Sequence, residues 1–122
     1  MDRAVKGNYF AKAAIEMALF DITARSLAIP VYQLFGGKVR DRIALAWTLA
    51  TGDTARDIEE AEEKLATRIH HIFKIKIGAM DPREDVNRVA AISAAVGARA
   101  SIRVDVNQAW NEITAAQWLP AL

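Results

Sequence analysis

The feature that most constrains the fold of this chain is an alternation of apolar, strand-length runs with helix-length amphipathic segments. Three such runs cover residues 43–49, 73–78 and 101–107, and a helical pattern separates each run from the next. Strands this far apart in sequence pair in parallel through a helical crossover, whereas a hairpin needs only a short turn. The sequence therefore predicts an α/β fold with a parallel sheet, built from three successive strand–helix units.

Capping residues indicate where the helices between these runs begin. Thr54 and Asp57 have the spacing of a modest capping box. Asp81 followed by Pro82 is a strong helix start, because Asp accepts a free backbone N–H and Pro fits the first helical position. Asn111 is predicted to cap a final helix.

Charged side chains gather on one face of the second and third runs. Side chains alternate along a strand, so Lys74 and Lys76 share one face while their apolar neighbours take the other. In the third run, Arg103, Asp105 and Asn107 share a face in the same way. Parallel strands are usually covered on both faces, so we expect the charged face to look into a protein interior. Charged groups are costly there unless they perform a task, and the pattern predicts a catalytic site.

The composition excludes several classes of function. Acidic and basic residues are interspersed and the net charge is only +1, which argues against nucleic-acid binding and against a charged membrane surface. No apolar run approaches the roughly 18 residues of a membrane span, and the first residues lack the apolar stretch of a secretory signal. The chain has no cysteine, so it has neither disulfides nor thiolate chemistry. We predict a cytoplasmic protein whose partners are neither nucleic acid nor membrane.

The residue types on the charged face suit removal of a proton next to a carboxylate. Residues two apart on a strand, such as Lys74 and Lys76, lie about 6.5–7 Å apart. Mutual repulsion and desolvation make a lysine easier to deprotonate, as a general base requires. Asp105 stands at the C-terminal end of its strand, where α/β barrels place catalytic groups, and its oxygens suit Mg²⁺ or Mn²⁺. A metal-held oxyanion facing a lysine base would favour this chemistry.

Each of these residues also has a structural interpretation. Lys74 and Lys76 could occupy the solvated face of an edge strand, where lysine protects against aggregation. Asp105 and Asn107 could serve a turn or a helix cap. Arg103 could form a structural ion pair as readily as a substrate contact.

At these residues the chain resembles the enolase superfamily and, within it, the muconate lactonizing branch. Lys74-Ile75-Lys76 is similar to that branch's Lys-x-Lys motif on the second barrel strand. Its third-strand metal-ligand motif is similar to Asp105-Val106-Asn107-Gln108 followed by Trp110. The stretches 6–12 and 46–54 look specifically like muconate cycloisomerases, and the resemblance covers essentially the whole chain.

The resemblance implies a partial TIM-like (β/α) barrel preceded by the C-terminal helices of an α+β capping domain. Residues 1–40 would finish the capping domain, and residues 41–122 would form the first part of a modified TIM barrel, its first three βα units. Three parallel strands do not close a barrel, and they leave two open edges. We therefore expect the chain to be a piece of a larger protein.

The implied activity is the reversible lactonization of cis,cis-muconate to muconolactone in aromatic catabolism, an isomerase reaction on a small dicarboxylate. Lys76 would be the catalytic acid/base, and Lys74 would tune Lys76 and contact the substrate carboxylate. Asp105 would be the first of three ligands to Mn²⁺ or Mg²⁺, and Asn107 would support metal and substrate indirectly. The full-length enzyme would be a homo-oligomer.

Other functions share part of this pattern. A dipeptide epimerase or an o-succinylbenzoate synthase of the same branch would use the same lysine and aspartate chemistry, although Trp47-Thr48-Leu49 favours the cycloisomerase. A non-catalytic remnant is the alternative of another class. The resemblance places the other metal ligands and the opposing acid/base beyond Leu122, and one ligand cannot hold an octahedral cation firmly. We expect the 122-residue chain alone to be inactive.

Overall fold

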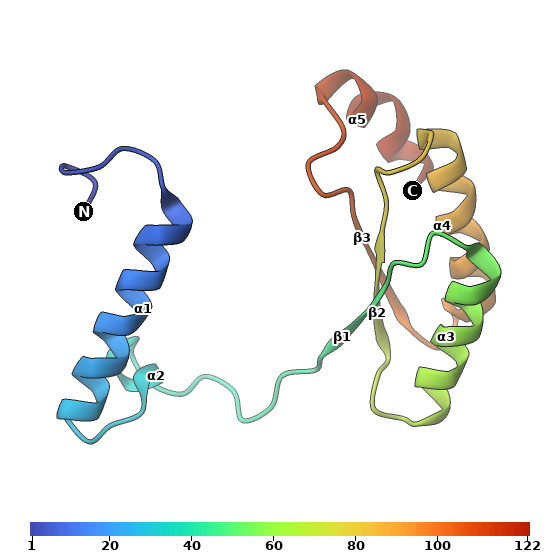
Figure 1. Ribbon diagram of the computed structural model, residues 1–122. Coiled ribbons are helices and arrows are strands. Elements are labelled where there is room, and N and C mark those ends of the chain that lie inside the picture. Colours follow the sequence, from blue (N-terminus) through green and yellow to red (C-terminus); the bar gives the residue numbers. More distant parts are fainter. The chain divides into compact units, whose positions relative to one another are not determined.

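The predicted parallel sheet is present in the computed structural model, which describes residues 1–122 (Figure 1). The chain divides into two compact units, Met1–Ile43 and Ala44–Leu122. The first unit is helical, and the second holds every strand. The assignment of residues 1–40 to a capping domain and of residues 41–122 to a barrel stays a prediction.

The first unit consists of α1 (Tyr9–Ser26) and the short α2 (Val31–Leu34). The rings of Phe20 and Phe35 pack with their centroids 4.7 Å apart and tie the two helices together. Gly36 and Gly37 follow α2 with positive φ angles, which residues without a Cβ adopt at little steric cost. No helix of the chain has both the length and the hydropathy that crossing a membrane requires.

The second unit is a three-stranded sheet with helical crossovers. Strands β1 (Ala46–Leu49), β2 (Ile72–Lys76) and β3 (Ser101–Asp105) lie in that order, and both pairings are parallel. Helix α3 (Thr54–Ala66) connects β1 to β2, and α4 (Pro82–Val96) connects β2 to β3. Helix α5 (Glu112–Trp118) and a 3₁₀ turn (Leu119–Ala121) follow. The α/β class is confirmed.

The first strand is shorter than the apolar run 43–49 that predicted it. Ile43 and Leu45 are 78% and 67% exposed and lie outside β1. The only partner of β1 is β2, which begins at Ile72, opposite Ala46. The residues before Ala46 therefore have no strand to pair with.

Two of the predicted helix caps are confirmed and one is wrong. Asp81 and Asn111 each accept a hydrogen bond from a backbone N–H in the first turn of their helices. Helix α3 is instead capped by Asp53, which accepts the N–H of Arg56 at 2.9 Å. Thr54 is already the first helical residue, and the Asp57 side chain is buried in another contact, so these two residues form no capping box.

One face of the sheet is packed and the other is open. Helices α3 and α4 lie on the same side of the sheet (Figure 1), as expected when consecutive parallel strands are joined by right-handed crossovers. Apolar residues of the packed face and of the two helices above it form one buried cluster: Leu49, Ala61, Phe73, Ile75, Ile77, Val89, Ile92 and Val96. The face of Lys74 and Lys76 is not enclosed, so the expectation of a buried charged face is wrong for this chain.

Phe73 lies fully buried at the centre of this cluster, on the middle strand. We predict that Phe73→Ala lowers the free energy of unfolding by about 3–5 kcal/mol, because it removes buried surface and leaves a cavity. Urea unfolding of the full chain, followed by circular dichroism, measures the change. Phe10→Ala is the matched control, since Phe10 is 95% exposed. An equal effect of the two substitutions would contradict the packing described here.

Candidate active site

The lysines and the aspartate singled out from the sequence lie side by side at the C-terminal ends of β2 and β3. The register places Lys76 opposite Asp105, and Lys74 lies two residues earlier on the same face of the sheet. The Nζ atom of Lys74 lies 3.1 Å from Oδ2 of Asp105. Both side chains are only partly covered, at 37% and 36% exposure, so solvent or a ligand can reach the pair.

The carboxylate of Asp105 is held in its ionised form mainly by Asn107 and Lys74, with a smaller contribution from the charge of Lys76. Its Oδ1 accepts the backbone N–H of Asn107 at 3.0 Å, and its Oδ2 faces Lys74. The Asn107 hydrogen bond is the larger cause and the Lys74 contact the next, and together they lower the pKa of Asp105 below its usual value. Ionised carboxylate oxygens are the ligands that hard divalent cations prefer.

Asn107 forms a tight turn directly after β3. Its φ angle is +49°, in the left-handed region that Asn tolerates better than most residues. Its side-chain amide donates to the carbonyl oxygen of Asp105 at 3.3 Å. These contacts match the turn interpretation, and a role toward metal or substrate stays a prediction.

A pocket of about 330 Å³ opens at the C-terminal ends of the strands. Its lining includes Lys76 and Asn107, together with Thr51 from the loop after β1 and Met80 from the loop after β2. The pocket thus includes Lys76 and Asn107 of the predicted site residues, whereas Lys74 and Asp105 do not line it. Arg103 lies on the same face of β3 in register with Lys74, is exposed and forms no ion pair, so the structural ion pair considered for it is absent.

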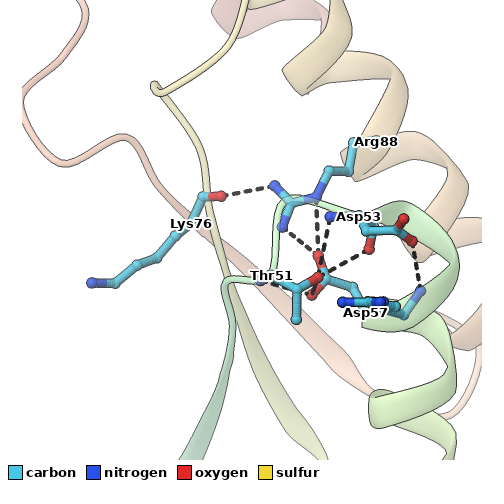
Figure 2. A network of polar contacts seen from close by, with 6 residues as sticks. Thr51, Asp53, Asp57, Lys76 and Arg88 are labelled. Atoms are coloured by element: carbon cyan, nitrogen blue, oxygen red, sulfur yellow. Dashed lines mark hydrogen bonds and ion pairs between the residues drawn. The ribbon is translucent and has the colours of Figure 1, made fainter.

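A buried network beneath the site was not predicted from the sequence. The Arg88 guanidinium on α4 forms an ion pair with the Asp57 carboxylate on α3, and these side chains are 3% and 0% exposed (Figure 2). The other Asp57 oxygen accepts the N–H and the hydroxyl of Thr51, at 3.2 and 2.8 Å. Arg88 also donates to the backbone carbonyl of Lys76 at 2.8 Å.

One sequence signal could have revealed this network. Asp57 precedes Ala61 by four residues, and Arg88 precedes Ile92 by four, so each stands in the buried stripe of its helix. Charges of opposite sign at two core positions of neighbouring crossover helices indicate a buried pair.

Gly78 allows the loops after β2 and β3 to approach each other closely. A Cβ at this position would lie 2.7 Å from both Cβ of Ala109 and the carbonyl oxygen of Val106, and the φ angle is +99°. The N–H of Gly78 donates to Oδ2 of the buried Asp85 at 2.8 Å. The loop that follows Lys76 is thus anchored to α4 and packed against the loop that follows Asp105.

The chain does not supply a complete metal site. No group of three or more His, Cys, Asp or Glu residues could together hold a metal ion. Asp105 has suitable oxygens, yet one of them is engaged by the Lys74 ammonium. These residues therefore do not fit a bound cation by themselves, and Asp105 is a single candidate ligand.

Two family models match the chain. The enolase C-terminal domain-like model matches residues 56–122, and the mandelate racemase/muconate lactonizing enzyme N-terminal domain matches residues 1–36. The chain therefore belongs to the enolase superfamily, in its mandelate racemase/muconate lactonizing enzyme family.

Relatives and solved structures agree with this family. The chain is 55% identical to chloromuconate cycloisomerase of Pseudomonas sp. strain P51 and 49% identical to muconate cycloisomerase 1-1 of Acinetobacter lwoffii, over its whole length and over 33% and 32% of theirs. A muconate cycloisomerase structure from Pseudomonas fluorescens matches with a TM-score of 0.89 and 50% identity, over 99% of this chain and 34% of that one. A muconate lactonizing enzyme structure from Klebsiella pneumoniae matches with a TM-score of 0.87 and 49% identity, over 100% and 33%. The chain spans about a third of the length of the curated relatives it matches.

The two largest causes of the lowered Asp105 pKa can be separated by substitution. We predict that Lys74→Met raises the pKa of Asp105 but leaves it below its usual value, because the Asn107 N–H is the larger cause. A lowered carboxyl pKa stabilises the fold above the unfolded-state pKa, and this contribution is lost as the pH falls through the folded-state value. The variant should therefore lose this contribution at a higher pH.

An NMR titration of the Asp105 carboxyl group in the full chain measures this effect. Lys64→Met is the control, since Lys64 pairs with Glu63 on α3. Either an unchanged pKa of Asp105 or a complete return to its usual value would contradict the ranking of the two causes.

Proposed function

We propose that this chain is the part of a muconate cycloisomerase-like enzyme that carries the acid/base lysine. The whole enzyme would interconvert cis,cis-muconate and muconolactone in aromatic catabolism. The observation that carries the proposal is the placement of Lys74 and Lys76 beside Asp105, at the open ends of neighbouring parallel strands. The identity to cycloisomerases along the whole chain favours this reaction over those of a dipeptide epimerase or an o-succinylbenzoate synthase.

In this proposal Lys76 moves the proton. During lactonization, one carboxylate oxygen of muconate adds to the carbon–carbon double bond next to the other carboxylate. The Lys76 ammonium gives its proton to the carbon beside that second carboxylate, and in reverse the Lys76 amine takes this proton while the ring C–O bond breaks. Lys76 suits the role because it is among the residues that line the pocket at the strand ends. Lys74 would contact a carboxylate of the substrate.

A divalent cation, Mn²⁺ or Mg²⁺, would stabilise negative charge that develops on the substrate carboxylate. We propose Asp105 as one of its ligands, because this carboxylate is ionised and stands at the strand end. The remaining ligands would lie in the part of the whole enzyme that corresponds to the relatives' residues outside the matched third. Asn107 would support the cation and the substrate indirectly, through its hydrogen bond to Asp105. The homo-oligomer and the cytoplasmic location stay predictions.

A hybrid enzyme tests this function. The matching 122 residues of the Pseudomonas sp. strain P51 chloromuconate cycloisomerase would be replaced by this chain, and loss of cis,cis-muconate and of chloromuconate would be followed by ultraviolet absorbance. We predict that the hybrid is active on at least one of them. Lys76→Ala should lower kcat about 10²- to 10⁴-fold, the usual contribution of general acid–base catalysis.

Lys38→Ala is the matched control, because Lys38 belongs to the first unit and pairs with Asp41 at the surface. Full activity of Lys76→Ala would make the base assignment wrong. A folded hybrid without activity would favour the non-catalytic alternative. The 122-residue chain by itself should show no turnover, since it has one candidate metal ligand.

A further inference from the structure

The peptide group that follows Lys76 is held from both sides. Its carbonyl oxygen, that of Lys76, accepts a hydrogen bond from Nη1 of Arg88 at 2.8 Å (Figure 2). Its N–H, that of Ile77, donates to the carbonyl oxygen of Asp105 at 3.0 Å. Helix α4 and strand β3 therefore fix the orientation of this one peptide plane, and with it the backbone from which the Lys76 side chain leaves.

Arg88 takes the place of a missing strand partner. The ladder between β1 and β2 ends where Leu49 pairs with Ile75, one residue before Lys76. The Lys76 carbonyl consequently has no partner in β1, and a backbone carbonyl at the edge of a packed core needs a donor. The guanidinium supplies that donor from the neighbouring crossover helix.

Arg88 is itself held rigidly. Its Nε donates to Oδ2 of Asp57 at 3.0 Å, and its Nη2 donates to the same oxygen, so the planar fork has one orientation. Asp57 is fixed in turn by two hydrogen bonds from Thr51, in the loop after β1. A shift of the guanidinium would therefore disturb both the Lys76 backbone and the loop that lines the same pocket.

We infer that Arg88 is a positioning residue for the acid/base Lys76, acting through the Lys76 carbonyl, with Asp57 as the fixed counter-charge that orients it. This role rests on the proposed function of Lys76. Arg88 is 4% exposed and its charge is balanced by Asp57, so it acts by geometry. Rotation of the peptide plane would move the end of the long lysine side chain, and a misplacement of about 1 Å can cost about 100-fold in rate.

The test removes the donor while keeping the charges balanced. In the hybrid enzyme, Arg88→Met combined with Asp57→Leu replaces the buried pair by apolar side chains of similar size, which buried pairs often tolerate. We expect kcat to fall about 10- to 100-fold with KM little changed. The matched control is Arg99→Met with Glu62→Leu, an ion pair between arginine and glutamate that is 52% and 44% exposed. This control should keep kcat.

A second variant covers the case in which the double variant does not fold. Arg88→Lys keeps a positive charge for Asp57 but lacks the planar fork that reaches both Asp57 and the Lys76 carbonyl. We expect it to melt within a few degrees of the unsubstituted hybrid and still to lose kcat. Unchanged kcat in either folded variant would overturn the positioning role.

Hydrogen exchange at the Ile77 amide tests the same role without turnover. If Arg88 holds this peptide plane, the Ile77 N–H should exchange faster in the Arg88 variants than in the Arg99 control. Unchanged Ile77 protection would overturn the inference. An inactive unsubstituted hybrid would refute the proposed function instead, and Ile77 exchange would still decide whether Arg88 holds the Lys76 backbone.

Discussion

The buried ion pair between Asp57 and Arg88 is the interaction on which the site end of the sheet depends. Removing two charges from water is costly, and the cost is offset only when the remaining polar atoms also find partners. Here they do, because Thr51 donates to Asp57 and the Lys76 carbonyl accepts from Arg88. Breaking half of such a pair costs about 3–5 kcal/mol. The pair therefore joins α3, α4, β2 and the loop after β1 into one rigid support.

The two faces of the sheet differ in how they are covered. Both crossover helices lie on one side, so the apolar face is packed and the charged face stays open to a ligand. The Lys74–Asp105 pair on the open face is partly exposed, so water screens it, it adds little to stability, and it can exchange partners. The buried pair cannot, because neither partner reaches solvent. Similar ionic groups thus form a partly exposed contact on one face of the sheet and a buried contact behind the other face.

Much of this arrangement could be predicted from the sequence. Four features follow from local spacing and are confirmed. They are the strand–helix alternation, the parallel order of the strands, the face that Lys74 and Lys76 share, and the helix cap at Asp81. The prediction for Asp57 was wrong, because its spacing fits a capping box and also the buried stripe of α3. The predicted length of the first strand was wrong as well, since the observed length depends on where its partner β2 begins.

By itself, the sequence determined which side chains share a face and how the strands follow one another, because both depend on the two-residue period of a strand and on the length of its crossovers. It also carried the motifs that identify the family. Only the tertiary structure decided which charges meet. Asp57 and Arg88 are 31 residues apart in the chain and come within hydrogen-bond distance once α3 and α4 pack on the same side of the sheet. Local spacing indicates that each of these charges stands in the buried stripe of its helix, but the contact between them depends on the relative position of whole helices.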